Sequence, residues 1–349
     1  MVGAAAPNSI RRHAERLEAD GYSGLAVVDS QNLSGDPYVA LALAATVTER
    51  LGLATGVTNP YTRHPAATAS SIATVQSASK GRAVLGIGRG DSALAHLGLS
   101  PAPVDLFERY LRRLQGYLRG EDVEFDEDTA VAPVGALGLA HHPVASRIHW
   151  IANLPKVPLD VAASGPRVIE LAARVADRIT FALGADLERL RWGIELARAA
   201  RTDAGLDPDT LGLGAYVNVA VHPDADVARR LVAGGLSTLA RFNVLHGRTS
   251  GPLAESDRNV LGTLRDRYDM NHHTEPGSAQ ASALTTEFAH RHALIGSAAE
   301  VLGRFRELQG LGLGKFVVMG APRAPGLEDE GRLAQAAFAS DVLPALTSE

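Results

Sequence analysis

Short apolar segments with strand character alternate with longer segments of helical character along most of this chain of 349 residues. Strands that alternate with helices in this way form a parallel sheet with the helices outside it. The sheet is either an eight-stranded barrel or an open doubly wound sheet. The length favours the barrel, for which about 250 residues plus insertions is typical. The expected strands cover residues 25–29, 51–58, 82–88, 159–163, 178–183, 211–221 and 315–319.

These strands leave an eight-stranded barrel one strand short. Residues 2–6 either form a reduced first strand, or the barrel has a gap beside its last strand. We therefore predict a (β/α)8 TIM barrel with a short or missing first strand, in which residues 1–349 form a single domain. Residues 120–147 are acidic and contain Pro and Gly, which predicts a peripheral loop. Residues 243–290 break the alternation and predict an insertion over the barrel mouth, before the last strand.

The composition excludes several classes of protein. The net charge is −5, and neither charge sign forms a long run, which argues against a nucleic-acid partner. No run approaches the ~18 apolar residues of a membrane span, and the first residues do not form a secretory signal, so we expect a cytoplasmic protein without a membrane partner. The chain has no cysteine, which excludes disulfides, thiolate metal ligands and a cysteine nucleophile. Redox chemistry would therefore need a cofactor.

The segment from Leu51 to Pro65 carries the strongest sign of a site. Its strand runs into Gly56, whose missing Cβ permits close approach of a ligand. A turn and the basic pair Arg63 and His64 follow. His64 is a candidate substrate residue, although a His-Pro pair is also common in an ordinary turn.

Alternate glycines end the next strand. Gly86, Gly88 and Gly90 precede Asp91, and such glycines let the backbone approach a flat ring or a phosphate closely. The dinucleotide fingerprint fails because it needs a glycine where Asp91 stands, and the Walker loop fails because no Gly-Lys-Ser/Thr follows. A tight turn without a ligand is the alternative interpretation.

Two further strand ends carry small or polar residues. Asp29 and Ser30 follow one strand, and residues 163–166 end another and open a helix at Pro166. The free amides at such a helix start can bind a phosphate or a carboxylate, although the segment is equally typical of an ordinary loop. In a barrel all these ends lie on the catalytic face, so they would surround one cleft. Such a rim can hold a planar cofactor with a polar tail.

The remaining motifs exclude other chemistry. No histidine pair has a metal-binding spacing, so we predict that the protein holds no metal. No Gly-x-Ser-x-Gly turn occurs, so a serine hydrolase is not expected. His272 and Phe242 lie in or beside the predicted insertion and are candidates for the substrate pocket.

These segments, in this order, resemble the luciferase-like monooxygenase superfamily. Within it they are similar to the coenzyme F420-dependent reductases typified by methylenetetrahydromethanopterin reductase. Residues 56–65, 81–91 and 162–167 carry the likeness, which spans residues 9–319. The resemblance implies a barrel with an insertion before its last strand. It also implies a deazaflavin, coenzyme F420, or alternatively FMN, at the carboxyl ends of the strands.

The resemblance further implies a site for the tricyclic ring. A non-proline cis peptide bond between Gly56 and Val57 would press on the back of the ring, Asp29 and Ser30 would border it, and the loop after residue 162 would take the phosphate tail. The implied cofactor-binding residues are Asp29, Ser30, Thr55, Gly56, Val57, Thr58, Gly88, Arg89, Gly90, Asp91, Ala163, Ser164, Gly165 and Pro166.

One residue of the resembled reductases is missing. They carry an acidic residue on the first strand for proton transfer, and residues 2–6 offer none. Asp91, with Asp29 second, is therefore our candidate for the catalytic carboxylate, since burial could raise its pKa toward neutrality.

The function that follows is hydride transfer between F420 and a small organic substrate that contains a C=N, C=C or C=O bond. An FMN-dependent monooxygenase and a non-catalytic barrel are the alternatives. The resemblance suggests a homodimer, and the Ala-rich helices expected at 37–50 and 66–79 carry small residues suited to close packing across a two-fold axis.

Overall fold

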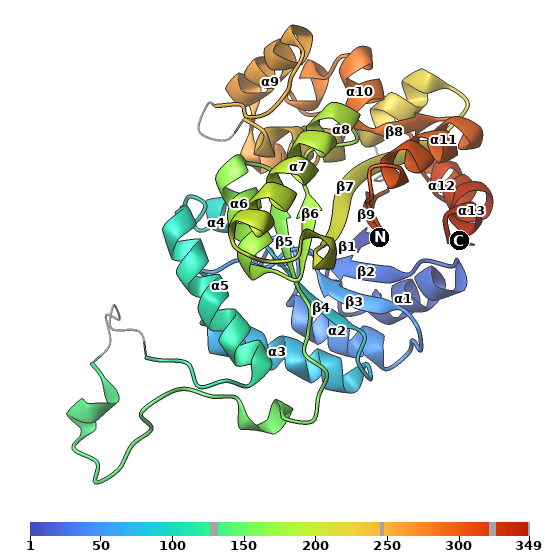
Figure 1. Cartoon of the computed structure of the whole chain (residues 1–349). Helices are drawn as coiled ribbons and strands as arrows, with labels where there is room; N and C mark the ends of the chain where they lie inside the picture. Colours follow the sequence, from blue (N-terminus) through green and yellow to red (C-terminus); the bar gives the residue numbers. More distant parts are fainter. Residues whose placement is uncertain (126–131, 245–247, 321–325, 348–349) are drawn as a thin grey trace.

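The computed structural model describes residues 1–125, 132–244, 248–320 and 326–347, and shows a barrel of parallel strands with helices around it (Figure 1). Each strand from β1 to β8 pairs with the next, and β9 also pairs with β7. β9 lies beside β1, so the sheet nearly closes on itself. The predicted TIM barrel is confirmed. The strands are β1 (Val2–Gly3), β2 (Gly24–Val27), β3 (Gly52–Thr55), β4 (Ala83–Ile87), β5 (Leu159–Ala163), β6 (Arg178–Phe181), β7 (Gly212–Val221), β8 (Leu294–Gly296) and β9 (Lys315–Met319).

Two short strands, β1 and β8, add to the seven strands that the sequence predicts. β1 is a reduced first strand of two residues, paired with Ala26 and Val27 of β2. β8 is an additional strand that the sequence pattern does not predict. It pairs only with Val219–Val221 at the end of β7, while the earlier part of β7 pairs with β9. A strand this short, between two helices, shows no alternation from which it could be recognised.

The helices lie outside the sheet, and side chains cap several of their ends. Asp36 accepts hydrogen bonds from the N–H groups of Tyr38 and Val39 at the start of α2, and Ser297 and Glu300 form a capping box at α11. The helices are α1 (Ile10–Ala19), α2 (Pro37–Ala45), α3 (Pro65–Ala78), α4 (Ser92–Ala95), α5 (Val104–Arg119), α6 (Pro166–Val175), α7 (Leu187–Asp203), α8 (Ala225–Phe242), α9 (Glu255–Arg267), α10 (Thr286–His292), α11 (Ala298–Gln309), α12 (Glu328–Ala337) and α13 (Leu343–Thr347).

Two predicted helix boundaries are wrong. α2 ends at Ala45 rather than Arg50, because the Glu18 carboxylate accepts hydrogen bonds from the N–H groups of residues 49–51 and holds them outside the helix. The sequence pattern also predicts a terminal helix that begins at Leu333, but α12 begins at Glu328, where its acidic first turn complements the helix dipole. The sequence pattern also predicts none of α9, α10 and α11.

Large and small side chains lie on opposite faces of the barrel strands. Leu25, Val27 and Leu53 belong to the main apolar core between the strands and the helices. Ala26 and Ala54 alternate with these residues along β2 and β3 and therefore face the barrel interior. These small inward-facing residues leave space inside the barrel.

The predicted insertion forms a layer beside α8. α9 and α10 pack against α8 and share a second apolar core with it, to which Leu231, Leu264 and Phe288 contribute. Residues 245–247 of the predicted insertion lie outside the described residues. The position of this segment over the barrel mouth stays a prediction.

The segment predicted as a peripheral loop extends away from the barrel (Figure 1). Val123 and Ser146 pair in an antiparallel bridge at its base, and Val134–Leu137 form the short helix η1. Residues 126–131 lie outside the described residues. Among the helices that the structure describes, none has the length and apolar character needed to cross a membrane.

Candidate active site

The bulge after β3 lies among the smallest residues of the barrel. The Gly56–Val57 peptide bond is cis, as the resemblance implies. A Cβ on Gly56 would lie 2.8 Å from the Ala26 Cβ, and a Cβ on Gly88 would lie 3.2 Å from Val57 Cγ2. Val57 therefore lies beside Gly88 of the next strand end, and neither glycine leaves room for a larger residue. Two of the predicted strand ends thus lie in direct contact.

A buried carboxylate connects the ends of β2 and β3. Asp29 Oδ2 accepts hydrogen bonds from Thr58 Oγ1 at 2.7 Å and from Arg63 Nη1 at 2.6 Å. Arg63 also pairs with Asp36 at 2.7 Å, and its guanidinium lies 4.9 Å from the centre of the Tyr38 ring. Thr55, the last residue of β3, donates a hydrogen bond from its Oγ1 to the Gly86 carbonyl at 2.6 Å. Asp29 is therefore held in a hydrogen-bond network between the two loops, and its catalytic role stays a prediction.

The loop after β4 carries a second buried carboxylate. Asp91 pairs with Arg241, the penultimate residue of α8, and this ion pair is only slightly exposed. Burial raises the pKa of Asp91 even though Arg241 acts in the opposite direction. Gly90 has a φ of +88°, and a Cβ there would lie 2.3 Å from Leu94 Cδ1, so this turn requires glycine. The neighbouring Arg89 donates to the Ala102 carbonyl.

The loop after β5 leads into α6 as predicted. Ala163 ends the strand, Gly165 is the N-cap of α6 without a side-chain cap, and Pro166 is its first residue. Ser164 Oγ donates to the carbonyl of Phe242 at 3.1 Å, which brings the end of α8 to this loop. A Cβ on Gly165 would meet no atom within 4 Å, so the helix start is open for a ligand.

Several buried polar atoms at these strand ends have no hydrogen-bond partner among the described residues. Ser30 Oγ follows β2, Asn59 Nδ2 follows β3 and Asp91 Oδ1 follows β4. A buried polar group without a partner costs about 1–3 kcal/mol. Three such atoms from three neighbouring loops fit a polar ligand that would pair with them.

Two residues of the predicted insertion, Tyr268 and His273, lie next to the arginine that pairs with Asp91. The Arg241 guanidinium, paired with Asp91, lies 4.8 Å from the centre of the Tyr268 ring. Tyr268 Oη lies 2.7 Å from His273 Nδ1. Burial, followed by the charges of Arg241 and His96, lowers the pKa of His273 to about 4, so this imidazole is neutral at neutral pH. The cluster of Asp91, Arg241, Tyr268 and His273 joins the loop after β4 to the insertion.

The three predicted substrate residues lie in different surroundings. His272 is exposed and pairs with Asp269 at 2.7 Å, which raises the pKa of His272. His64 is the N-cap of α3, where its Nδ1 accepts from the Ala66 N–H. Phe242 lies at the end of α8 beside Ser164. Their contact with a substrate stays a prediction, and only Phe242 is placed next to a predicted cofactor residue by these contacts.

Arg63, Arg241, Tyr268 and His273 are the site residues that sequence reasoning does not select. Arg63 stands in the segment with the strongest signal, directly before His64. Arg241 lies 150 residues from Asp91 in the chain, and no local pattern links two residues at that distance. His273 differs from its neighbour His272 only in burial, which the sequence does not reveal.

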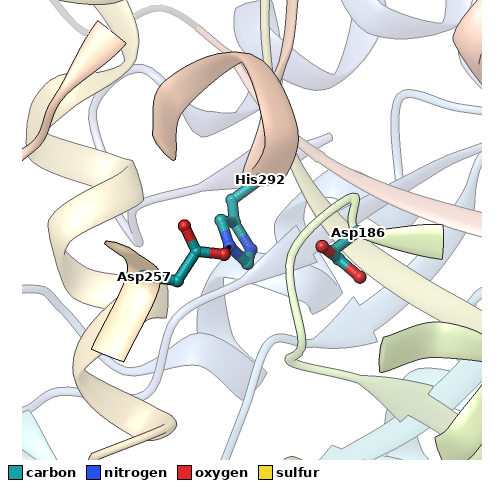
Figure 2. Close-up of side chains that lie close together, drawn as sticks. All are labelled: Asp186, Asp257 and His292. Carbon is teal, nitrogen blue, oxygen red and sulfur yellow. Dashed lines mark hydrogen bonds and ion pairs between the residues drawn. The ribbon is translucent and has the colours of Figure 1, made fainter. Parts of the chain in front are cut away.

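A separate group of side chains has potential metal ligands. Asp186, Asp257 and His292 bring three ligand atoms within 4.8 Å of one another (Figure 2). Asp257 Oδ2 already accepts hydrogen bonds from Arg291 Nη1 at 2.7 Å and from His292 Nε2 at 3.0 Å. The buried Arg189 guanidinium lies nearby but donates to the Pro252 carbonyl and to Asn243 Oδ1. Asp257 is thus paired with the Arg291 guanidinium, which supplies positive charge of the kind that a metal ion would bring. The absence of a metal from the protein stays a prediction.

The chain matches known proteins over most of its length. Residues 1–314 match the model of the luciferase-like monooxygenase family. The chain therefore belongs to this family. It is 27% identical over 324 residues to 5,10-methylenetetrahydromethanopterin reductase of Methanolobus tindarius, covering 91% of this chain and 92% of that protein. It is 32% identical over 243 residues to F420-dependent glucose-6-phosphate dehydrogenase of Beutenbergia cavernae, covering 65% of this chain and 68% of that protein.

A solved structure shares the fold. The coenzyme F420-dependent tetrahydromethanopterin reductase from Methanopyrus kandleri superimposes with a TM-score of 0.73 at 20% identity, covering 99% of this chain and 98% of that one. Since identity at this level reports on the fold alone, the similarity supports the barrel described above.

We expect Asp257→Asn to destabilise the protein by about 2 kcal/mol at neutral pH, because it leaves Arg291 and His292 without a charged partner. Burial acts to raise the pKa of Asp257, but the hydrogen bonds from His292 and Arg291 outweigh it and hold the pKa below its usual range. The wild-type charge therefore stabilises the fold above the unfolded-state pKa of about 4 and is lost as the pH falls through the lowered folded-state pKa. Urea denaturation along a pH series should show that the unfolding free energies of the wild type and the variant become equal in acid. Asp269→Asn, in an exposed ion pair, is the control. A difference in unfolding free energy between wild type and Asp257→Asn that stays constant over the pH series would contradict the prediction.

Proposed function

We propose that the protein is a cytoplasmic oxidoreductase that transfers a hydride between coenzyme F420 and a small organic substrate. The observation that carries the proposal is the set of three buried, unpartnered polar atoms around the Gly56–Val57 bulge at the carboxyl ends of β2, β3 and β4. Relatives named as F420-dependent enzymes, together with the shared fold, support the choice of cofactor.

Each strand end has a part in holding the cofactor. Val57 would support the back of the ring from inside the barrel, and Ser30 and Asn59 would pair with its polar edge through their free atoms. Thr55, Thr58 and Asp29 fix the bulge and the loops beside it through buried hydrogen bonds. The open N-terminus of α6 at Gly165 would take the phosphate of the tail, because its free N–H groups and its dipole favour an anion.

Bound F420 supplies a ring that accepts or donates a hydride. The chain's part includes moving the accompanying proton, and Asp91 is the group suited to it. Its Oδ1 is buried and unpartnered, and its pKa is raised by burial. Arg241 binds Oδ2 and so orients the carboxyl group. The Asp29 carboxylate, held by Thr58 and Arg63, instead serves to position the loop after β3.

The substrate would enter beside Asp91, under the insertion. Tyr268 and His273 lie behind Arg241, and Phe242 lies beside the loop after β5. These groups form a partly aromatic wall suited to a small molecule with a C=O, C=C or C=N bond. An FMN-dependent monooxygenase is the second candidate function, since the matched family is described by that activity.

Cofactor binding can be tested through a single charge at Gly165. Both Gly165→Asp and Gly165→Asn introduce good N-cap residues that stabilise α6, so neither should unfold the protein. The aspartate should weaken F420 binding by at least about tenfold relative to the asparagine, because only the aspartate repels the phosphate. Fluorescence quenching measures the affinity of each variant for F420 and for FMN. Tight FMN binding with none for F420 would favour the monooxygenase, and binding of neither would indicate a non-catalytic barrel.

The proton-transfer role predicts the behaviour of Asp91→Asn. This variant keeps the hydrogen bond with Arg241 but cannot donate the proton, so turnover should fall by about 10²–10⁴-fold. F420 affinity should fall far less than turnover, because the amide keeps a polar atom at the position of Oδ1. A panel of aldehydes, alcohols and imines, followed through the F420 absorbance, gives the substrate and the rates, with Asp269→Asn as the control. Wild-type turnover by Asp91→Asn would remove the carboxyl group from the mechanism.

We further propose that the protein is a homodimer that associates through α2 and α3. Val39 on α2 has 55% of its surface exposed, and both helices contain many small residues. Val39→Asp should therefore shift the sedimentation equilibrium from dimer to monomer, because it places a charge in an apolar contact. A monomeric wild type would contradict the dimer.

The proposed location is tested separately: cell fractionation should find the protein with cytoplasmic enzymes.

A further inference from the structure

The barrel contains a cavity of about 400 Å³ at the end opposite to the candidate active site. It is lined by the beginnings of the strands, among them Gly24, Gly52, Gly212 and Lys315. In an α/β barrel the catalytic loops lie at the other ends of the strands. The cavity is therefore distinct from the site proposed for the cofactor.

Small inward-facing residues create this cavity. Ala26 of β2, Ala54 of β3 and Gly214 of β7 line it, where barrel interiors are more often filled by bulky branched side chains. A Cβ on Gly214 would lie 2.8 Å from the Lys315 carbonyl oxygen, so the close approach of β7 and β9 also requires glycine there. The volume falls within the range of about 300–1,000 Å³ found for small-molecule sites.

Lys315 and Asp160 form an ion pair at the cavity, so their charges offset each other. The Lys315 ammonium donates to Asp160 Oδ2 and lies 3.5 Å from Thr180 Oγ1, and Thr180 in turn donates to Asp160. Asp160 and Thr180 are buried. An ammonium group has three protons, so Lys315 has one donor left for a ligand.

Arg178 supplies a second cation, and this one is not balanced. It lines the cavity at the start of β6 and has no hydrogen-bond or ion-pair partner within residues 1–125, 132–244, 248–320 and 326–347. A Cβ on Gly212 would lie 2.9 Å from Arg178 Cγ, so the glycine makes room for the arginine stem. Burial, followed by the charge of Lys315, lowers the pKa of the Met1 amino group in the cavity to about 5, so this group is uncharged at neutral pH. With Asp160 offsetting Lys315, the charged groups lining or adjoining the cavity carry a net charge of about +1.

We propose that this cavity is a binding site for a small organic anion, a carboxylate or a phosphate ester with an apolar body. The Arg178 guanidinium would bind the anionic group, since its planar fork matches two oxygens of a carboxylate or a phosphate. The free proton of Lys315 would add a third hydrogen bond. The apolar part would lie against Ala54 and Val317. The site does not depend on the proposed function, because it shares no residue with the cofactor loops.

Benzoate is the first probe, and benzamide is its neutral counterpart. Calorimetric titration and the shift of the melting temperature measure binding to the wild type and to three variants. Arg178→Gln removes the cation, and Arg174→Gln is the matched control on the exposed side of α6. Ala54→Leu fills the cavity with apolar atoms and should leave the protein at least as stable. A melting temperature at or above that of the wild type verifies that this variant is folded.

We expect benzoate to bind the wild type and Arg174→Gln with one site, and benzamide to bind much more weakly. Arg178→Gln should lose at least about tenfold in affinity, which corresponds to about 1.4 kcal/mol. Ala54→Leu should not bind. Phenyl phosphate in place of benzoate distinguishes the two anion classes, and tighter binding by either one supports the site.

Equal binding of benzoate to the wild type, Arg178→Gln and Ala54→Leu would place the ligand elsewhere and overturn the proposal. Failure of the wild type to bind either anion up to about 10 mM would overturn it as well. Neither result bears on the Gly165 variants, whose F420 affinity reports on the opposite end of the barrel.

Discussion

The strands of this barrel separate large from small side chains, and both ends of the molecule depend on that separation. Leu25, Val27 and Leu53 face the helices and belong to the main core, while Ala26, Ala54 and Gly214 face the interior. Because the inner layer is small, the barrel is not packed solid from end to end. Val57 can lie inside at the carboxyl ends, and a cavity remains at the amino ends.

Arginines then join segments that are far apart in the chain. Arg63 connects the loops after β2 and β3, and Arg241 connects the loop after β4 to α8. Arg291 holds α10 to α9 through Asp257. A buried carboxylate is costly without a partner, so each of these cations makes a buried acid tolerable where chemistry or a loop contact needs it. The carboxyl face is thus assembled by charge pairing on top of apolar packing.

The two buried carboxylates at the strand ends differ in what surrounds them. Asp29 has a hydroxyl and a guanidinium on the same oxygen, whereas Asp91 has one oxygen bound and the other unpartnered among the described residues. This difference is the basis on which we propose Asp91, rather than Asp29, as the proton donor. It also offers an account of how a chain without an acid on β1 could supply the proton.

The sequence by itself determined the barrel, seven of its strands and the loops that form its carboxyl face, because alternation and small-residue motifs are local properties of the chain. It also led to the cis bond between Gly56 and Val57 through the resemblance of that segment. Tertiary structure alone decided the pairing of Asp91 with Arg241, the burial of His273 rather than His272, and the three-residue strand β8. These depend on contacts between distant segments, and side-chain burial has no local signature. For the same reason the cavity around Arg178 could not be read from the sequence, since an empty volume exists only once all the strands are in place.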